Sequence, residues 1–110
     1  MTTQQPRQSA IAARSNTFPK LNDLTQNLVF GDIWERPELS KRDRSLITVA
    51  VLVALYRTDQ LRNHLIRALN NGVTKEEIVE VITHMAFYAG WPTAANAAAV
   101  AGEVFDERGI

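Results

Sequence analysis

The chain has 110 residues, and its 12 basic side chains balance its 12 acidic ones, so the formal net charge at pH 7 is zero. A nucleic-acid partner is not expected, because phosphate backbones are bound by clustered positive charge. The lack of cysteine excludes disulfides, thiolate chemistry and cysteine-ligated metal sites. Length and a hydrophobic content of 45% indicate one folded domain.

The N-terminal segment is polar and holds no apolar run of the kind found in signal peptides. No segment reaches the roughly 18 apolar residues that a membrane span requires. We therefore expect a cytoplasmic protein. We also expect residues 1–17 to form a flexible arm that can dock on a neighbouring subunit, and residues 18–110 to form the helical domain.

Two elements are expected before residue 40. Leu21, Leu24 and Leu28 recur at helical spacing and predict a helix over 18–30, with Pro19 suited to an early helical position. Residues 31–39 carry glycine and proline at the spacing of a structured loop, for which Trp34 is the expected anchor.

The second helix is the most apolar part of the chain. Ser40, with Asp43 three residues later, predicts the N-terminal cap of a helix. From Leu46 to Tyr56 the only polar residue that interrupts the run is Thr48. A helix that is apolar on all sides must be buried on all sides, and in a chain this small we expect that burial to include a contact between subunits.

Three further helices complete the all-α prediction. Thr58 is the expected cap of a helix in which Leu61, His64, Leu65 and Ala68 form one apolar stripe, ended by Asn71-Gly72. A capping box over 74–77 opens the next helix, which ends at Gly90. Pro92 can start the last helix, whose many alanines would let another helix approach closely.

Histidine is the side chain best matched to proton transfer near neutral pH, and the chain has two. His64 lies on an apolar stripe, where partial desolvation would favour its neutral form. It is either a base or proton relay, or a core histidine satisfied by a backbone carbonyl. His84 and Tyr88 share a helix face, and Glu80 and Glu77 lie near it. These residues form either a carboxylate-oriented site or a surface pair at a subunit contact.

Five arginines surround the second and third helices, and the planar fork of arginine matches a carboxylate. Each is either a ligand for an acidic substrate or a surface charge; they are Arg42, Arg44, Arg57, Arg62 and Arg67. Neither His-x-x-x-His nor His-Glu-x-x-His is present, and the two histidines lie on different helices, so no metal site is expected.

Four stretches, in this order along the chain, resemble the carboxymuconolactone decarboxylase family. They are Phe30-Gly-Asp-Ile-Trp-Glu-Arg-Pro-Glu-Leu, Arg42-Asp-Arg-Ser-Leu-Ile-Thr-Val-Ala, His64-Leu-Ile-Arg-Ala-Leu-Asn-Asn-Gly and Thr83-His-Met-Ala-Phe-Tyr-Ala-Gly-Trp-Pro. The resemblance covers residues 18 to 106. It implies the helical fold shared with alkylhydroperoxidase D, about five to six helices in an obligate trimer or hexamer.

The resemblance also implies a reaction. In the peroxidase branch of the superfamily, two cysteines stand seven and four residues before the helical histidine, where this chain has Arg57 and Gln60. Thiol peroxidase chemistry is thus excluded, while the histidine is retained as His64. The family's named reaction is a cofactor-free decarboxylation of a carboxylated γ-lactone, 4-carboxymuconolactone, in the catabolism of aromatic compounds.

On this basis we assign His64 as the acid/base group and Arg44 or Arg57 as the ligand of a substrate carboxylate. His84, Tyr88 or Trp91 would shape the pocket or donate to the lactone oxygen. Fold alone does not decide function. Two alternatives stay open: a related lyase or isomerase acting on another lactone or oxo-acid, and a non-catalytic oligomeric scaffold or binding protein of the same fold.

Overall fold

The computed structural model describes residues 17–110, and all the regular structure in that range is helical, which confirms the all-α prediction. The chain divides into two compact units, Met1–Glu38 and Leu39–Ile110. Apart from Thr17, the arm predicted for residues 1–17 lies outside the described residues.

The first unit contains the helix predicted over 18–30, in two forms. Helix α2 spans Pro19–Leu24 with proline in its first turn, and it continues as the π-helix η1 over Thr25–Phe30. Glycine is required directly after η1, because a Cβ on Gly31 would lie 2.8 Å from the carbonyl oxygen of Asn27. The short 3₁₀ helix η2, Ile33–Glu35, carries Trp34, whose ring lies 5.7 Å from that of Phe30. Trp34 therefore contacts the end of η1, as expected of a loop anchor.

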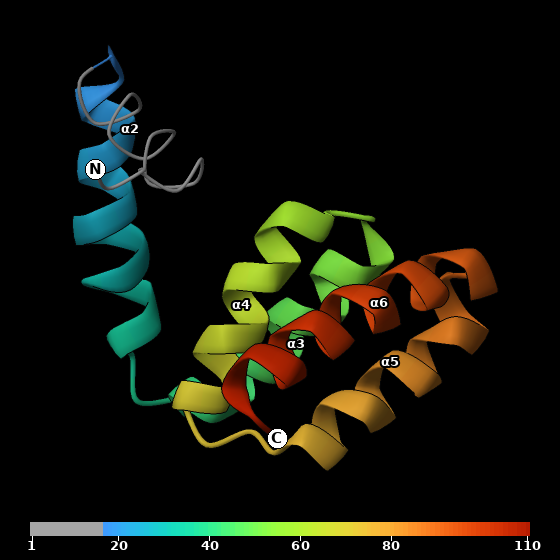
Figure 1. Cartoon of the computed structure of the whole chain (residues 1–110). Helices are drawn as coiled ribbons and strands as arrows, with labels where there is room; N and C mark the ends of the chain where they lie inside the picture. The colour runs from blue at the N-terminus through green and yellow to red at the C-terminus, as the bar shows by residue number, and fades with distance from the viewer. Residues whose placement is uncertain (1–16) are drawn as a thin grey trace, which may run out of the picture. The chain divides into compact units, whose positions relative to one another are not determined.

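The second unit is a four-helix arrangement (Figure 1). Its helices are α3 (Lys41–Ala54), α4 (Thr58–Asn70), α5 (Lys75–Ala89) and α6 (Trp91–Arg108). Helices α3 and α6 each pack against both α4 and α5. The core between them is aliphatic and is made mainly by Val49, Val53, Leu61, Leu65, Ile78 and Val104.

Local capping signals start two of these helices where the sequence predicts. The Oγ atom of Ser40 accepts a hydrogen bond from the N–H of Asp43 at 3.0 Å. Thr74 and Glu77 form a reciprocal capping box, with bonds of 2.9 and 3.1 Å. Gly90 separates α5 from α6. Its φ of 110° is a backbone conformation that residues other than glycine rarely adopt.

The predicted cap at Thr58 is wrong. Arg57 occupies the N-cap position of α4 and makes no capping hydrogen bond with its side chain. The reason lies in the preceding helix: the N–H of Arg57 donates to the carbonyl of Leu52 at 2.9 Å, so the chain turns into α4 one residue earlier.

One side of α3 is exposed in the single chain. Ile47, Val51 and Leu55 recur every four residues and are each about half exposed, whereas Val49 and Val53 are buried. The apolar run of α3 therefore has more apolar surface than the four-helix core covers. The prediction that a second subunit covers the remainder stays a prediction.

Candidate active site

His64 lies on α4 at the edge of the buried stripe formed by Leu61, Leu65 and Ala68. Its side chain is half-buried and its Nδ1 atom is buried. Burial, and to a lesser degree the positive charge of Arg67, lower the pKa of His64 below the ordinary value of 6.5. At pH 7 the imidazole is mostly neutral, and its protonated form gives up a proton more readily than free imidazole does.

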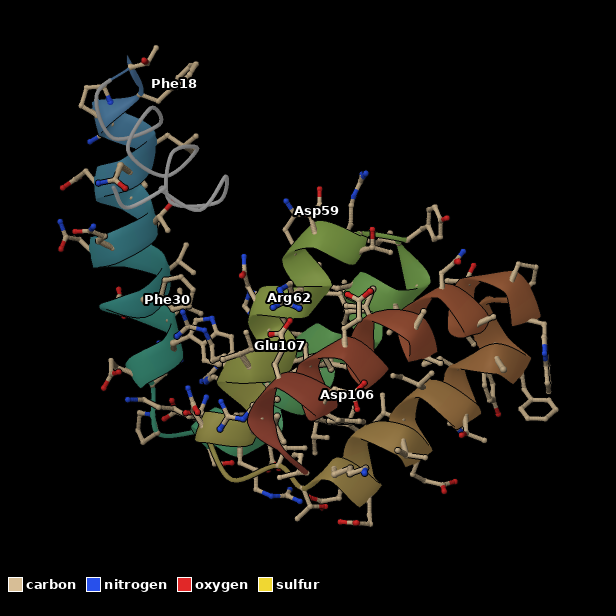
Figure 2. All side chains as sticks on the ribbon, viewed as in Figure 1. Phe18, Phe30, Asp59, Arg62, Asp106 and Glu107 are labelled. Atoms are coloured by element: carbon tan, nitrogen blue, oxygen red, sulfur yellow. The ribbon has the colours of Figure 1, made fainter. Side chains whose placement is uncertain are left out.

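Helical spacing places His64 on the side of α4 that faces α3. Asn71, two turns further along the same edge, donates from Nδ2 to the Oγ of Ser45 on α3 at 3.0 Å. On the opposite edge, Arg62 points toward Glu107 of α6 and pairs with it (Figure 2). The imidazole therefore lies in the region where α3 and α4 meet, away from α6.

A pocket of about 400 Å³ lies between α3 and α5. Its walls are apolar and are formed by Leu46, Ala50, Val81 and Met85. Three polar side chains of α5 complete the lining: Glu77, Glu80 and His84. An apolar cleft with a few polar groups is a common form of small-molecule site, so this pocket is the second place where chemistry can be expected.

One of the two carboxylates at this pocket already has partners within the fold. Glu77 pairs with Arg42 of α3 and also accepts from the backbone N–H of Thr74, which fixes its carboxylate. Glu80 is exposed and lies one turn before His84. The ring of His84 stacks on that of Tyr88 with centroids 4.6 Å apart. The groups left to meet a ligand are one carboxylate and one imidazole.

The pocket between α3 and α5 does not gather the predicted site residues. The pocket contains His84 but not His64, and its lining includes none of the other predicted ligands. Tyr88 and Trp91 are mostly exposed, and Trp91 makes an edge contact with Phe87. Their roles remain predictions.

The two predicted arginine ligands also lie apart from the pocket. The Nε of Arg44 donates to the carbonyl oxygen of Leu39 at 3.2 Å, at the start of α3. Arg57 is exposed at the start of α4, two helical turns before His64. Arg57 and His64 therefore share a helix, whereas His84 belongs to another part of the surface.

Sequence reasoning missed one polar pair, Tyr56 and Asn96. The Nδ2 of Asn96 on α6 donates to the Oη of Tyr56 at 3.0 Å, across 40 residues of sequence. Tyr56 stood at the end of an apolar run and Asn96 stood among alanines, so spacing along the chain offered no signal that they meet.

Within residues 17–110, no group of three or more His, Asp or Glu side chains is placed to hold a metal ion. In the same range no helix combines the length and the apolar character needed to cross a membrane.

Comparison with known proteins gives consistent results. The chain is 44% identical over 103 residues to a 4-carboxymuconolactone decarboxylase of Acinetobacter baylyi, an alignment that covers 87% of this chain and 77% of that protein. It is 33% identical over 85 residues to a nitrosuccinic acid decarboxylase of Metarhizium robertsii, and this alignment covers 59% of that protein. It is also 32% identical over 81 residues to an uncharacterized 15.0 kDa protein of Paracoccus denitrificans, and this alignment covers 60% of that protein.

Residues 19–103 match the carboxymuconolactone decarboxylase family, which confirms the resemblance of the four sequence stretches. The match extends from the first unit, at Pro19, through most of α6. The chain therefore belongs to the carboxymuconolactone decarboxylase family.

Proposed function

We propose that this chain is a cofactor-free decarboxylase of a small carboxylated lactone such as 4-carboxymuconolactone. The observation that carries the proposal is the 44% identity to the Acinetobacter enzyme across most of both chains. A second decarboxylase among the relatives, acting on nitrosuccinic acid, supports the reaction type and widens the range of acids to be tested.

The reaction makes few demands on the protein. The bond between the ring carbon and the carboxylate breaks, carbon dioxide leaves, and the electron pair moves through the ring alkene to the carbonyl oxygen of the lactone. A proton is then added to ring carbon, so one proton is consumed for each carbon dioxide released. The enzyme must hold the anion, stabilise the developing oxyanion and supply the proton.

His64 is the proposed proton donor. Its lowered pKa makes its protonated form a ready acid, and a bound anionic substrate would raise that pKa and restore the proton. Arg44 or Arg57 would hold a substrate carboxylate. His84, Tyr88 or Trp91 would shape the pocket or donate to the lactone oxygen.

We further propose that the chain works as a trimer or hexamer. The exposed side of α3, formed by Ile47, Val51 and Leu55, supports this, as do the exposed rings of Phe87 and Trp91 near the end of α5. Apolar surface of this kind is a usual mark of a protein contact. Assembly could also bring together site residues that the single chain leaves apart.

The assembly is tested at Val51. A glutamate there would place a charge in the proposed contact, so Val51→Glu should lower the subunit number measured by light scattering during gel filtration. Val51→Leu is the matched control, because it keeps the surface apolar and should leave the subunit number unchanged. A Val51→Glu protein with the wild-type subunit number would contradict the proposed contact.

The reaction is tested by incubating the wild-type protein with a panel that includes 4-carboxymuconolactone and nitrosuccinate. Loss of lactone absorbance and release of carbon dioxide are the two measurements. His64→Gln should lower kcat by about 10²- to 10⁴-fold, because it removes the proton-transferring group. Its circular dichroism spectrum should match that of the wild type. If His64→Gln keeps near-normal turnover, His64 is not the acid; if the wild type converts no acid in the panel, the proposed activity fails.

A further inference from the structure

Tyr56 forms the corner between α3 and α4 with an unusual backbone. Its φ is 59°, and it is the only residue other than glycine with positive φ within residues 17–110. The N–H of Tyr56 donates to Val53 at 3.1 Å, and the N–H of Arg57 donates to Leu52 at 2.9 Å. This pair of bonds is the Schellman ending of a helix, in which the left-handed position is usually glycine.

A tyrosine at this position is strained. In the left-handed conformation the Cβ atom approaches the following carbonyl oxygen, and strained residues of this kind concentrate at functional sites. Burial does not offset the strain, because the Tyr56 side chain is 57% exposed. Neither the turn nor the core therefore explains why this position carries a large aromatic residue.

The phenol is nevertheless held in place. Asn96, on α6, donates from Nδ2 to the Oη of Tyr56 at 3.0 Å, and both side chains are exposed. Since the phenol oxygen accepts this bond, its own proton is left to be donated to another group. The pair thus presents an oriented O–H donor at the corner where α4 begins.

A cationic residue follows this donor in the chain. Arg57 follows Tyr56 directly and is exposed, and α4 continues from it to His64. A neutral O–H donor and a guanidinium are both suited to a carboxylate, and hydrogen bonds to a charged acceptor are stronger than neutral ones.

We infer that Tyr56, oriented by Asn96, is a substrate-binding residue whose phenol O–H donates a hydrogen bond to a carboxylate of the acidic substrate. This inference rests on the proposed function and adds a specificity-determining residue to it. The strained backbone is the consequence of keeping a phenol where glycine would suit the turn.

The test compares Tyr56→Phe, Tyr56→Gly and Asn70→Ala. Tyr56→Phe removes only the hydroxyl, so KM for 4-carboxymuconolactone should rise about 10- to 100-fold with kcat and Tm nearly unchanged. Tyr56→Gly relieves the strain, so its Tm should equal or exceed that of the wild type while its KM rises as much. Asn70→Ala is the matched control: it removes a different 3.0 Å side-chain hydrogen bond to α6, the one from Arg108, and should leave KM unchanged.

Calorimetric binding of 4-carboxymuconolactone to the same proteins, all carrying His64→Gln to prevent turnover, separates the inference from the proposed function. If the chain that carries only His64→Gln binds the lactone but the wild type does not convert it, the proposed function fails, while weaker binding after Tyr56→Phe still supports the inference. Equal binding by Tyr56→Phe, or an altered subunit number with unchanged KM, overturns the inference alone. A wild-type chain that neither binds nor converts the lactone overturns both.

Discussion

Asn70 and Asn71 are consecutive residues at the end of α4, and each makes one 3.0 Å hydrogen bond to another helix. Asn71 Nδ2 donates to the Oγ of Ser45, which is fully buried, whereas Asn70 Oδ1 accepts from Arg108 at the surface. The two bonds have the same length but differ in burial. They allow the contribution of burial to a hydrogen bond to be measured within one chain.

Replacing Asn71 should cost more stability than replacing Asn70. Asn71→Ala leaves the Ser45 hydroxyl buried without this partner, which costs about 1–3 kcal/mol. For a chain of this size that corresponds to a fall in Tm of about 4–12 °C. Asn70→Ala leaves only exposed groups that water can satisfy, so its cost should stay within about 0.5 kcal/mol, or about 2 °C.

The assay is thermal unfolding followed by circular dichroism at one fixed protein concentration, because self-association would make Tm depend on concentration. Ser45→Ala and the double variant Ser45→Ala/Asn71→Ala complete a double-mutant cycle. The double variant should be less destabilised than the sum of the single variants, by about 1 kcal/mol, since no partner is left alone. Equal Tm shifts for Asn70→Ala and Asn71→Ala, or strict additivity in the cycle, would refute the reasoning.

Three further outcomes are expected. Burial and the charge of Arg67 hold the folded pKa of His64 below 6.5, so its contribution to stability is complete above pH 6.5 and is lost as pH falls through the folded pKa. In urea unfolding over this window, the free energy of unfolding should therefore depend less on pH for His64→Gln than for the wild type. If protonated His64 is the acid, kcat/KM should fall as pH rises through this lowered pKa, and a flat pH–rate profile for the wild type would exclude that role. Thr74→Ala should lower stability by about 1 kcal/mol by removing the cap of α5, whereas Thr74→Ser should retain it, as measured by urea unfolding.

The helical pattern was predictable because its signals are local. Ser40 and Thr74 accept hydrogen bonds from backbone groups three residues away, so their capping roles depend on nothing distant. The stripe of Leu61, Leu65 and Ala68 was predictable because a helix places residues three and four apart on one face. The half-burial of His64 followed from its place beside that stripe.

The predictions that were wrong or missing concern features that depend on how one helix meets another. Thr58 has the chemistry of a cap, but the bond from Arg57 to Leu52 closes α3 and shifts the start of α4. The pocket was not predicted either, because its walls come from two helices whose inward residues look alike in sequence. Leu46 and Met85 are equally suited to a filled core and to the lining of a cavity.

The all-α class, the approximate extents of the helices and the family could be predicted from the sequence, because periodicity, caps and ordered motifs depend on residues close together in the chain. The contact between Tyr56 and Asn96, and the place of His84 in a pocket from which His64 is absent, follow only from the packing of the helices. These features depend on contacts between helices far apart in the chain. Packing geometry, and not local propensity, selects which side chains come together there.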